Sequence, residues 1–207
     1  MMFKLVKRTF DLFSSLALFI VISPLFLILA LMVRFNLGTP IFFRQTRAGK
    51  DMKPFEMIKF RTMTDEKDVE GNLLPDEQRA TGFGKWLRSS SLDELPELFN
   101  IIKGDMSVIG PRPLYQRYND YFTEEEKKRF WVRGGLITPD SVDPSPIISW
   151  DKEFQYDADY AENMSIKKDL HIFIGVFRIL FKRNTFDYGS FVRQPLDVER
   201  AGMANKE

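Results

Sequence analysis

The sequence of 207 residues contains no cysteine and a single histidine, His171. Without cysteine, the chain forms no disulfide, carries no thiolate nucleophile and has no cysteine-ligated zinc site. One histidine is too few for a metal site built from several imidazoles, and its place in a strongly apolar segment indicates a structural role. Any chemistry must therefore depend on carboxylates, hydroxyls, amines or a metal ion held by oxygen ligands.

Positive and negative side chains are nearly equal in number. The chain has 30 lysines and arginines against 29 aspartates and glutamates, a net charge of +1. This balance gives no support to a nucleic-acid partner. Phenylalanine, in contrast, is abundant, with 20 residues. That number indicates a large apolar surface, or a body that rests partly in a membrane interface.

The longest apolar run, residues 12–33, contains no charged side chain. A run of about 20 apolar residues is long enough to cross a bilayer. It is too long for the apolar part of a signal peptide, and no small-residue cleavage site follows it. Basic residues flank the run on both sides: Lys4, Lys7 and Arg8 before it, and Arg34, Arg44, Arg47 and Lys50 after it.

Ser23 and Pro24 lie near the middle of this run. Proline removes a helical hydrogen bond, and a serine hydroxyl can bond a nearby carbonyl and favour a bend. The pair fits a kinked helix that spans the membrane, or a re-entrant helix that leaves on the side it entered. Because basic flanks mark the cytoplasmic side, two basic flanks are compatible with re-entry. The sequence alone leaves both structures open.

Beyond this run the sequence predicts a small domain with few strands and several helices. Gly38-Thr39-Pro40 is a break, and short strands are expected over residues 41–43 and 54–61. The expected helices cover residues 83–88, 95–102, 115–133, 150–162 and 166–183. Residues 64–79 are expected to be a loop with a helical turn, and residues 134–146 a loop. Periodicity is lost from residue 184, where the chain is expected to fray.

The segment most informative for chemistry is residues 83–113, which contains the adjacent acids Asp93 and Glu94. Ser91 and Glu94 fit a capping box at a helix start, whereas Pro96 favours a start nearer Leu95. Either way the two carboxylates lie at the positive end of a helix, which favours their ionised form. An ionised carboxylate suits a nucleophile or a magnesium ligand. Taken alone, the two acids are equally explained as the ordinary start of a helix.

Four cations accompany the acids. Arg88 lies about one turn upstream, and Arg112 is held between two prolines, so its guanidinium has little freedom and offers a fork to phosphate oxygens. Lys59 and Arg61 lie on one face of the second expected strand. For this pair, solvated surface charge is a strong alternative. These residue types are the ones that handle a phosphoryl group.

The run from Phe83 to Pro113 resembles the signature of the bacterial sugar transferases, in the form of the small monotopic phosphoglycosyl transferases. The resemblance implies that Asp93 attacks the β-phosphate of a UDP-sugar, that UMP leaves, and that a polyprenyl phosphate (undecaprenyl phosphate) then takes the sugar phosphate from the aspartate. It implies Glu94 as an acid/base or metal-supporting partner and Mg²⁺ as the cofactor, held by Asp93. The implied phosphate- and substrate-binding residues are Arg88, Arg112, Lys59 and Arg61.

The same resemblance implies an organisation and a location. Residues 1–37 would form a re-entrant membrane helix bent at Ser23-Pro24, residues 38–183 the catalytic domain, and residues 184–207 a tail. The implied fold class is α+β: a small, mostly helical domain with a short β element and interfacial amphipathic helices. Such a protein is monotopic, on the cytoplasmic face of the bacterial inner membrane. It acts at the first membrane step of glycan assembly and has membrane lipid but no nucleic acid among its partners; a homodimer is left open.

Asp157 and Asp169 fall in a series that resembles the family's C-terminal half and are secondary candidates for the site. The chain departs from the family pattern over residues 134–146, where a Gly-Arg pair is missing. This departure puts recognition of the donor in doubt and keeps a second function open, that of a membrane-anchored nucleotide-sugar-binding or scaffold protein with weakened catalysis. A third possibility is a spanning anchor joined to an unrelated soluble domain.

Overall fold

The computed structural model describes residues 2–143, 145, 148–182 and 193–204. It combines helices with short strands and begins with a long apolar helix, which confirms the predicted α+β class in outline. The α-helices are α1 (Met2–Leu37), α2 (Asp76–Arg79), α3 (Gly82–Ser89), α4 (Glu97–Lys103), α5 (Trp150–Glu162), α6 (Ile166–Lys182) and α7 (Leu196–Ala204). The strands are β1 (Phe42–Ala48), β2 (Pro54–Phe60), β3 (Ser107–Ile109) and β4 (Gly135–Ile137). Five 3₁₀ turns complete the described chain: η1 (Lys50–Met52), η2 (Leu92–Glu94), η3 (Gln116–Tyr121), η4 (Glu126–Trp131) and η5 (Pro139–Val142).

The chain divides into two compact units. Unit 1 takes in Met1–Arg8, Thr46–Phe55 and Gly104–Glu207, and unit 2 takes in Thr9–Gln45 and Glu56–Lys103. The strands pair as two small sheets, β1 with β2 and β3 with β4. The candidate residues are therefore divided between the units: Asp93, Glu94, Lys59, Arg61 and Arg88 in unit 2, and Arg112, Asp157 and Asp169 in unit 1.

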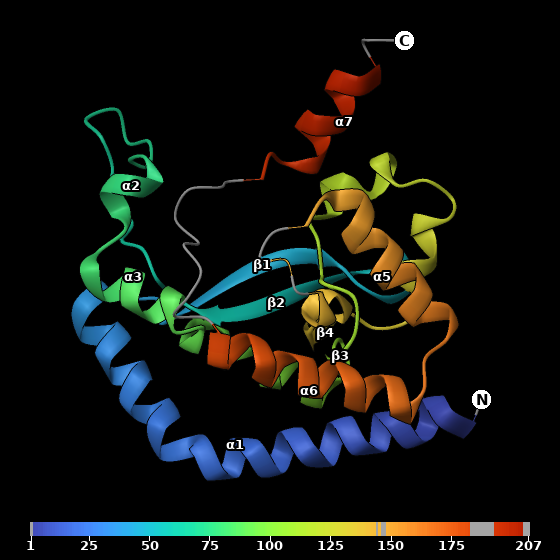
Figure 1. Cartoon of the computed structure of the whole chain (residues 1–207). Helices are drawn as coiled ribbons and strands as arrows, with labels where there is room; N and C mark the ends of the chain where they lie inside the picture. The colour runs from blue at the N-terminus through green and yellow to red at the C-terminus, as the bar shows by residue number, and fades with distance from the viewer. Residues whose placement is uncertain (1, 144, 146–147, 183–192, 205–207) are drawn as a thin grey trace. The chain divides into compact units, whose positions relative to one another are not determined.

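Helix α1 is continuous and contains Pro24. Figure 1 shows it as two arms that meet at an angle. The Ser23 hydroxyl donates a hydrogen bond to the Ile20 carbonyl over 2.8 Å, as expected of a serine beside a helix bend. By length and composition alone, the helix from Phe3 to Leu37 is apolar enough to cross a membrane.

The second arm of α1 supplies part of the core of unit 2. Leu29, Val33 and Leu37 are spaced four residues apart, so they lie on one face of the helix, and all three are buried. They pack in one cluster with Phe60 of β2 and Leu87 of α3. The opposite faces of α1 remain apolar and exposed, with large side chains including Phe10, Phe13, Ile20, Val21, Leu27, Ile28 and Phe35. The helix therefore both holds unit 2 together and presents an apolar surface.

Unit 1 is built around aromatic side chains and one short parallel sheet. A buried cluster joins Phe122 and Phe130 to Trp150 and Phe154 of α5. Strand β3 pairs with β4 in parallel, with Ser107 opposite Gly135 and Ile109 opposite Ile137. A Cβ added to Gly135 would lie 2.1 Å from the Gly110 nitrogen. The backbones approach so closely that only glycine fits there.

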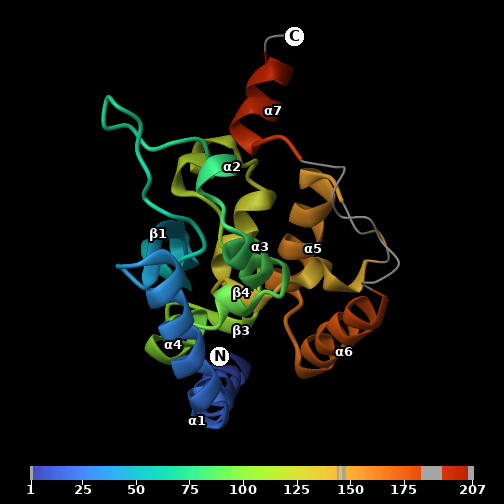
Figure 2. The same cartoon turned by 90° about the vertical axis from the view of Figure 1, so that its left-hand side faces the viewer.

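Helix α5 confirms the expected helix over residues 150–162, and α6 confirms the next one over residues 166–182; residue 183 lies outside the described residues. The Ser149 hydroxyl caps α5 by accepting a hydrogen bond from the Lys152 amide. Both views show the two helices running at an angle to each other (Figure 2). On α6, Ile172 is buried, while Leu170, Phe173 and Ile174 are exposed, so the helix is apolar beyond the face that packs.

The amphipathic helix predicted over residues 115–133 is wrong. The structure has the two 3₁₀ turns η3 and η4, separated by residues 122–125. The Thr123 amide donates to Glu126 and the Glu126 amide to the Thr123 hydroxyl, so a capping box begins a new turn in mid-segment. Tertiary packing of the buried Tyr118, Phe122 and Phe130 then outweighs helical periodicity.

Two further expectations need correction. Residues 134–146, expected to be a loop, contain β4 and η5, because β4 pairs with a strand some 28 residues earlier and such a partner leaves no local signal. The tail from residue 184 contains α7; residues 183–192 lie outside the described part. Leu196 is fully buried in the aromatic cluster of unit 1, and Arg200 forms ion pairs with Glu126 and Asp151.

The docking of α7 predicts a cost for truncating Leu196. Leu196→Ala should lower the free energy of unfolding by about 2–5 kcal/mol, because it removes a buried side chain and leaves a cavity. Thermal unfolding of the detergent-solubilised protein measures this. Val198→Ala, at an exposed position of the same helix, is the control and should change stability by about 0.5 kcal/mol or less. Equal effects of the two substitutions would mean that α7 does not pack on unit 1 in solution.

Candidate functional site

Asp93 and Glu94 lie in the 3₁₀ turn η2, between α3 and α4 of unit 2. Helix α3 is capped at its start by the Thr81 hydroxyl, which accepts from the Gly84 amide over 3.0 Å. It ends at Ser89, and Ser91 then adopts a left-handed conformation with φ 58°. A left-handed residue after a helix is a common stop signal.

The capping box predicted for Ser91 and Glu94 is therefore wrong. In the part of unit 2 that the structure describes, the Ser91 hydroxyl makes no capping bond to η2. Helix α4 begins at Glu97, two residues after the alternative start expected near Leu95, and Pro96 stands immediately before the helix. The two acids occupy the tight connection between helices, three and four residues before α4.

Lys59 of β2 is held between two carboxylates. Its Nζ lies 2.6 Å from Glu94 Oε1 and 3.2 Å from Glu97 Oε1. Burial alone would lower the pKa of Lys59, but the two carboxylates outweigh it and raise that pKa, so Lys59 stays charged. Glu97 is 3% exposed. The sequence argument missed it, although its spacing of three residues from Glu94 is a signal that was available.

Asn100 fastens the strand of Lys59 to α4. Its Oδ1 accepts a hydrogen bond from the Ile58 amide over 3.0 Å, and its Nδ2 donates to the Glu56 carbonyl over 2.6 Å. Asn100 is 1% exposed, so these bonds are shielded from water. They fix the register of β2 beside the helix that carries Glu97, and so fix where Lys59 meets the carboxylates.

The Asp93 carboxyl group is buried, with 7% of the residue exposed. Burial, and next the charge of Glu94, raise its pKa from 3.8 to about 6, against the opposing attraction of Lys59 and Arg88. The sequence argument expected a helix end to favour ionisation. The structure differs because desolvation outweighs every favourable charge around the group. Asp93 still loses its proton just below neutral pH.

Arg88 approaches this corner from α3. Its Nη2 donates a hydrogen bond to the Thr62 hydroxyl over 2.8 Å. Helix α3 lies tightly against the same residue, since a Cβ on Gly84 would be 1.8 Å from the Thr62 carbonyl oxygen. Glycine therefore sets the depth at which α3 sits and, with it, the position of Arg88.

Arg61 is buried and forms its hydrogen bonds with the backbone around it. Its Nη1 donates to the Thr39 carbonyl over 2.6 Å and its Nε to the Met63 carbonyl over 2.7 Å, while Nη2 pairs with Asp65 at 2.7 Å. These bonds tie the end of β2 to the segment after α1. Lys59, in contrast, forms an ion pair directly with Glu94, the neighbour of Asp93.

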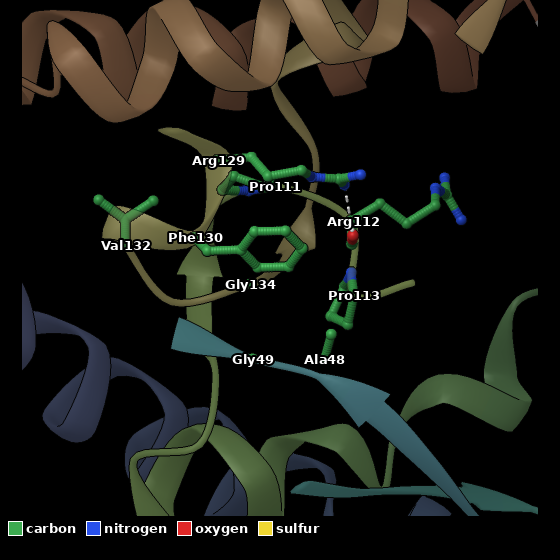
Figure 3. A pocket seen from close by; sticks show the side chains of 9 residues that line it. All are labelled: Ala48, Gly49, Pro111, Arg112, Pro113, Arg129, Phe130, Val132 and Gly134. Atoms are coloured by element: carbon green, nitrogen blue, oxygen red, sulfur yellow. Dashed lines mark hydrogen bonds between the residues drawn. The ribbon is translucent and has the colours of Figure 1, made fainter. Parts of the chain in front are cut away.

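Arg112 of unit 1 lies in the Gly110–Pro113 loop. Figure 3 shows its side chain leading away from Phe130 and Val132, beside a small hollow that Arg129 also lines. Arg129 donates from Nη2 to the Arg112 carbonyl over 2.8 Å. The same Nη2 lies 2.8 Å from Asp157 Oδ2 in an ion pair whose two side chains are 1% and 0% exposed. Sequence reasoning missed Arg129, which stands in a run of charges typical of a solvated surface.

The two secondary candidates are both partnered within unit 1. Burial raises the pKa of Asp157, against the attraction of Arg129. Asp169 Oδ2 accepts from Lys7 Nζ over 2.9 Å, and its Oδ1 accepts from the Tyr160 hydroxyl over 2.6 Å. Asp169 thus ties α6 to the first turns of α1, which is a structural task.

The residues around Asp93 fit a magnesium ion that takes most of its ligands from water and substrate. Among the described residues, no three acidic or histidine side chains are grouped as a complete metal site. Glu94 and Glu97 are engaged with Lys59, which leaves Asp93 as the available carboxylate. Magnesium is commonly held by one or two carboxylates together with water and substrate phosphates. The residues present suit that mode of binding.

The comparisons with known proteins now place the chain. A family model described as bacterial sugar transferase matches residues 2–183, so the chain belongs to this family. It is 44% identical over 168 residues to "Uncharacterized sugar transferase EpsL" of Bacillus subtilis (strain 168), an alignment that covers 81% of this chain and 83% of that protein.

Two further relatives carry more specific names. "UDP-glucose:undecaprenyl-phosphate glucose-1-phosphate transferase" of Klebsiella pneumoniae is 34% identical over 199 residues, which cover 87% of this chain and 41% of that protein. "Exopolysaccharide production protein ExoY" of Sinorhizobium fredii (strain NBRC 101917 / NGR234) is 33% identical over 183 residues, which cover 80% of this chain and 81% of that protein. The chain thus spans most of EpsL and ExoY but less than half of the Klebsiella enzyme.

The raised pKa of Asp93 predicts a pH-dependent gain in stability for Asp93→Asn. Stability from the protonated carboxyl is present below about pH 4 and is lost as the pH rises through about 6, where the buried group ionises. Asp93→Asn should therefore raise the unfolding temperature at pH 7.5, by about 2–4 °C for each kcal/mol recovered. At pH 4 the two proteins should unfold at nearly the same temperature.

Differential scanning calorimetry at the two pH values measures this difference. Glu77→Gln changes an exposed acid on α2 and is the matched control, with little effect at either pH. An equal change for Asp93→Asn at pH 4 and pH 7.5 would show that the buried charge is not what the substitution relieves.

Proposed function

We propose that this chain transfers a sugar-1-phosphate from a UDP-sugar to a polyprenyl phosphate, releasing UMP, with Asp93 as a covalent nucleophile. The observation that carries the proposal is the buried Asp93 carboxyl beside Glu94, which Lys59 holds in place. The name of the Klebsiella relative, a UDP-glucose:undecaprenyl-phosphate glucose-1-phosphate transferase, supports the same reaction class.

The proposed reaction has two phosphoryl transfers. An Asp93 oxygen forms a bond to the β-phosphorus of the UDP-sugar, and the bond from that phosphorus to the bridging oxygen breaks. UMP leaves with the electron pair, and the sugar phosphate becomes a mixed anhydride with Asp93. An oxygen of polyprenyl phosphate then attacks the same phosphorus, the bond to Asp93 breaks, and polyprenyl-diphosphate-sugar leaves with the carboxylate restored.

The neighbours of Asp93 supply charge and position more than acid–base chemistry, as phosphoryl transfer requires. Lys59 and Arg88 attract the Asp93 carboxylate, which favours its ionised, nucleophilic form. Glu94 is proposed as the acid/base or metal-supporting partner, and Arg88 and Arg112 as ligands of phosphate oxygens. Arg61 contributes through the fold, because its bonds go to the surrounding chain.

Mg²⁺, held by Asp93 and by the substrate's own oxygens, would offset the negative charge of the diphosphate. Burial of the site also changes the pKa and the hydration of the Asp93 carboxylate. A carboxylate with a pKa of about 6 is largely ionised at neutral pH and is less strongly hydrated than one in water. Such a group is ready to approach an anionic phosphate once the diphosphate charge is neutralised.

Helix α1 is proposed to be re-entrant, which places the protein on the cytoplasmic face of the bacterial inner membrane as a monotopic enzyme. The bend, the Ser23 hydrogen bond and the basic residues on both flanks support this arrangement. The exposed apolar face of α6 is proposed to rest in the membrane interface. An enzyme that joins a soluble donor to a lipid acceptor needs its site at such a boundary.

UMP release in the absence of the lipid tests the covalent step. Purified protein with Mg²⁺ and UDP-glucose, or another UDP-sugar, should release about one UMP per enzyme and then stop until polyprenyl phosphate is added. Asp93→Asn should release none. Glu94→Gln should slow the release by about 10²–10⁴-fold if Glu94 acts as an acid/base.

The exposed Glu77→Gln variant controls for handling of the protein and should release UMP as the unaltered chain does. UMP release that requires polyprenyl phosphate from the first turnover would favour direct transfer to the lipid without a covalent intermediate on Asp93. No release with any UDP-sugar, with or without the lipid, would favour the binding or scaffold function instead.

Single-cysteine labelling tests the membrane arrangement. Because the chain contains no cysteine, Lys4→Cys and Lys53→Cys each carry one thiol. In intact cells a membrane-impermeant maleimide should label neither, and after lysis it should label both, since re-entry keeps both positions inside. Labelling of the Lys4→Cys variant in intact cells would establish a spanning helix and overturn re-entry.

A further inference from the structure

Arg129 is a buried cation, and its ion pair with Asp157 gives no clear gain in the stability of the fold. It is 2% exposed, and its partner Asp157 is 0% exposed. A buried ion pair is often no more stabilising than well-packed apolar residues, because both charges lose their hydration. Here the polar atoms are also poorly satisfied: among the described residues, Arg129 Nη1 and both Asp157 carboxylate oxygens take part in no hydrogen bond.

The geometry joins this pair to the loop of Arg112. One nitrogen, Arg129 Nη2, donates to the Arg112 carbonyl over 2.8 Å and lies 2.8 Å from Asp157 Oδ2. The guanidinium is enclosed by aromatic rings, with the Phe154 centroid at 4.8 Å and the Phe122 centroid at 5.3 Å. Figure 3 shows the Arg129 guanidinium beside the backbone of Arg112, with its bond to the carbonyl drawn. Packing and charge therefore fix the donor in one place.

Backbone hydrogen bonds hold the loop on both sides of Arg112. The two flanking prolines carry no amide hydrogen, so they take part in backbone hydrogen bonds through their carbonyl groups alone. The Pro111 carbonyl accepts from the Gly135 amide over 2.9 Å, and the Leu114 carbonyl from the Ala48 amide over 2.9 Å. Between these two backbone bonds, the Arg112 carbonyl is fixed by the Arg129 side chain.

We propose that Arg129 is a positioning residue for Arg112, and that Asp157 acts by holding the Arg129 guanidinium against the loop carbonyl. The inference rests on the proposed function, in which Arg112 binds phosphate oxygens of the donor. Neither Arg129 nor Asp157 touches the donor in this account. A loosened loop leaves the fold intact but spreads the Arg112 guanidinium over many positions, which weakens donor binding more than chemistry.

Arg129→Lys is the informative substitution. Lysine keeps a positive charge near Asp157, but its side chain is shorter, so its ammonium does not reach the position of Arg129 Nη2 between the Asp157 carboxylate and the Arg112 carbonyl. Arg193→Lys is the matched control, because Arg193 also pairs with a buried glutamate, Glu153 at 2.7 Å, in unit 1. Arg193 donates hydrogen bonds to Glu153 and to the Ile148 carbonyl, and neither bond involves the Arg112 loop.

Hydrogen–deuterium exchange measures the position of the loop without any need for activity. In Arg129→Lys, exchange should be about 10-fold faster or more at the Gly135 and Ala48 amides, whose bonds to the loop depend on its order. In Arg193→Lys, exchange at both amides should match that of the unaltered chain. Unchanged exchange in Arg129→Lys would overturn the proposal. If Arg129→Lys does not fold, Asp157→Asn tests the same link, and its exchange should be faster at the same two amides.

Kinetics then test whether Arg129 acts through Arg112. Arg129→Lys should raise the KM for the UDP-sugar between about 10- and 100-fold with a smaller change in kcat. Combined with Arg112→Ala, it should add little to the effect of Arg112→Ala alone. Effects that multiply would show that Arg129 acts independently, and would overturn the positioning role while the proposed transfer stands. The opposite outcome is faster exchange at the two amides in Arg129→Lys, together with no UMP release by the unaltered chain. That outcome would support the positioning role of Arg129 and reject the proposed transfer reaction.

Discussion

Three carboxylates compete for one ammonium group in unit 2, and the arrangement of that unit follows from this constraint. Lys59 satisfies Glu94 and Glu97 directly, and Asp93 is left buried with a raised pKa. Asn100 fastens the strand of Lys59 to α4, and a left-handed turn at Ser91 brings the acids into the same corner. The result is a carboxyl group whose pKa of about 6 lies close to neutral pH. It lies beside cations that the diphosphate of the proposed donor would also attract.

Residues 9–37 of the apolar helix belong to the same compact unit as Asp93 and Glu94, so this part of the helix also has a structural role in unit 2. Leu29 and Val33 of α1 share a buried cluster with Leu87 of α3, the helix that carries Arg88. A displacement of the second arm of α1 would therefore be felt at the site through packed side chains. This connection offers a physical route by which a lipid environment can influence the acids, because the helix that meets lipid is also core.

Local sequence patterns predicted the structural elements that depend on residues close together in the chain. The apolar run, α3 and α5 were predictable, because helical periodicity and caps lie within short segments of the sequence. Partners distant in sequence were not: β4 depends on β3, α7 on a buried pocket for Leu196, and Arg129 on Asp157 28 residues later. The pKa of Asp93 was misjudged for a related reason, since burial is set by the whole unit and a helix end is only one local contribution.

The covalent sugar-phosphate anhydride on Asp93 is the central claim, and mass spectrometry of the quenched enzyme tests it most directly. After incubation with Mg²⁺ and a UDP-sugar, the account predicts that the intact mass increases by one sugar phosphate. Peptide mapping should place the added mass on Asp93, and a chase with polyprenyl phosphate should remove it within one turnover. An added mass on another residue, or one that the lipid cannot remove, would contradict the account. So would full transfer activity in Asp93→Asn.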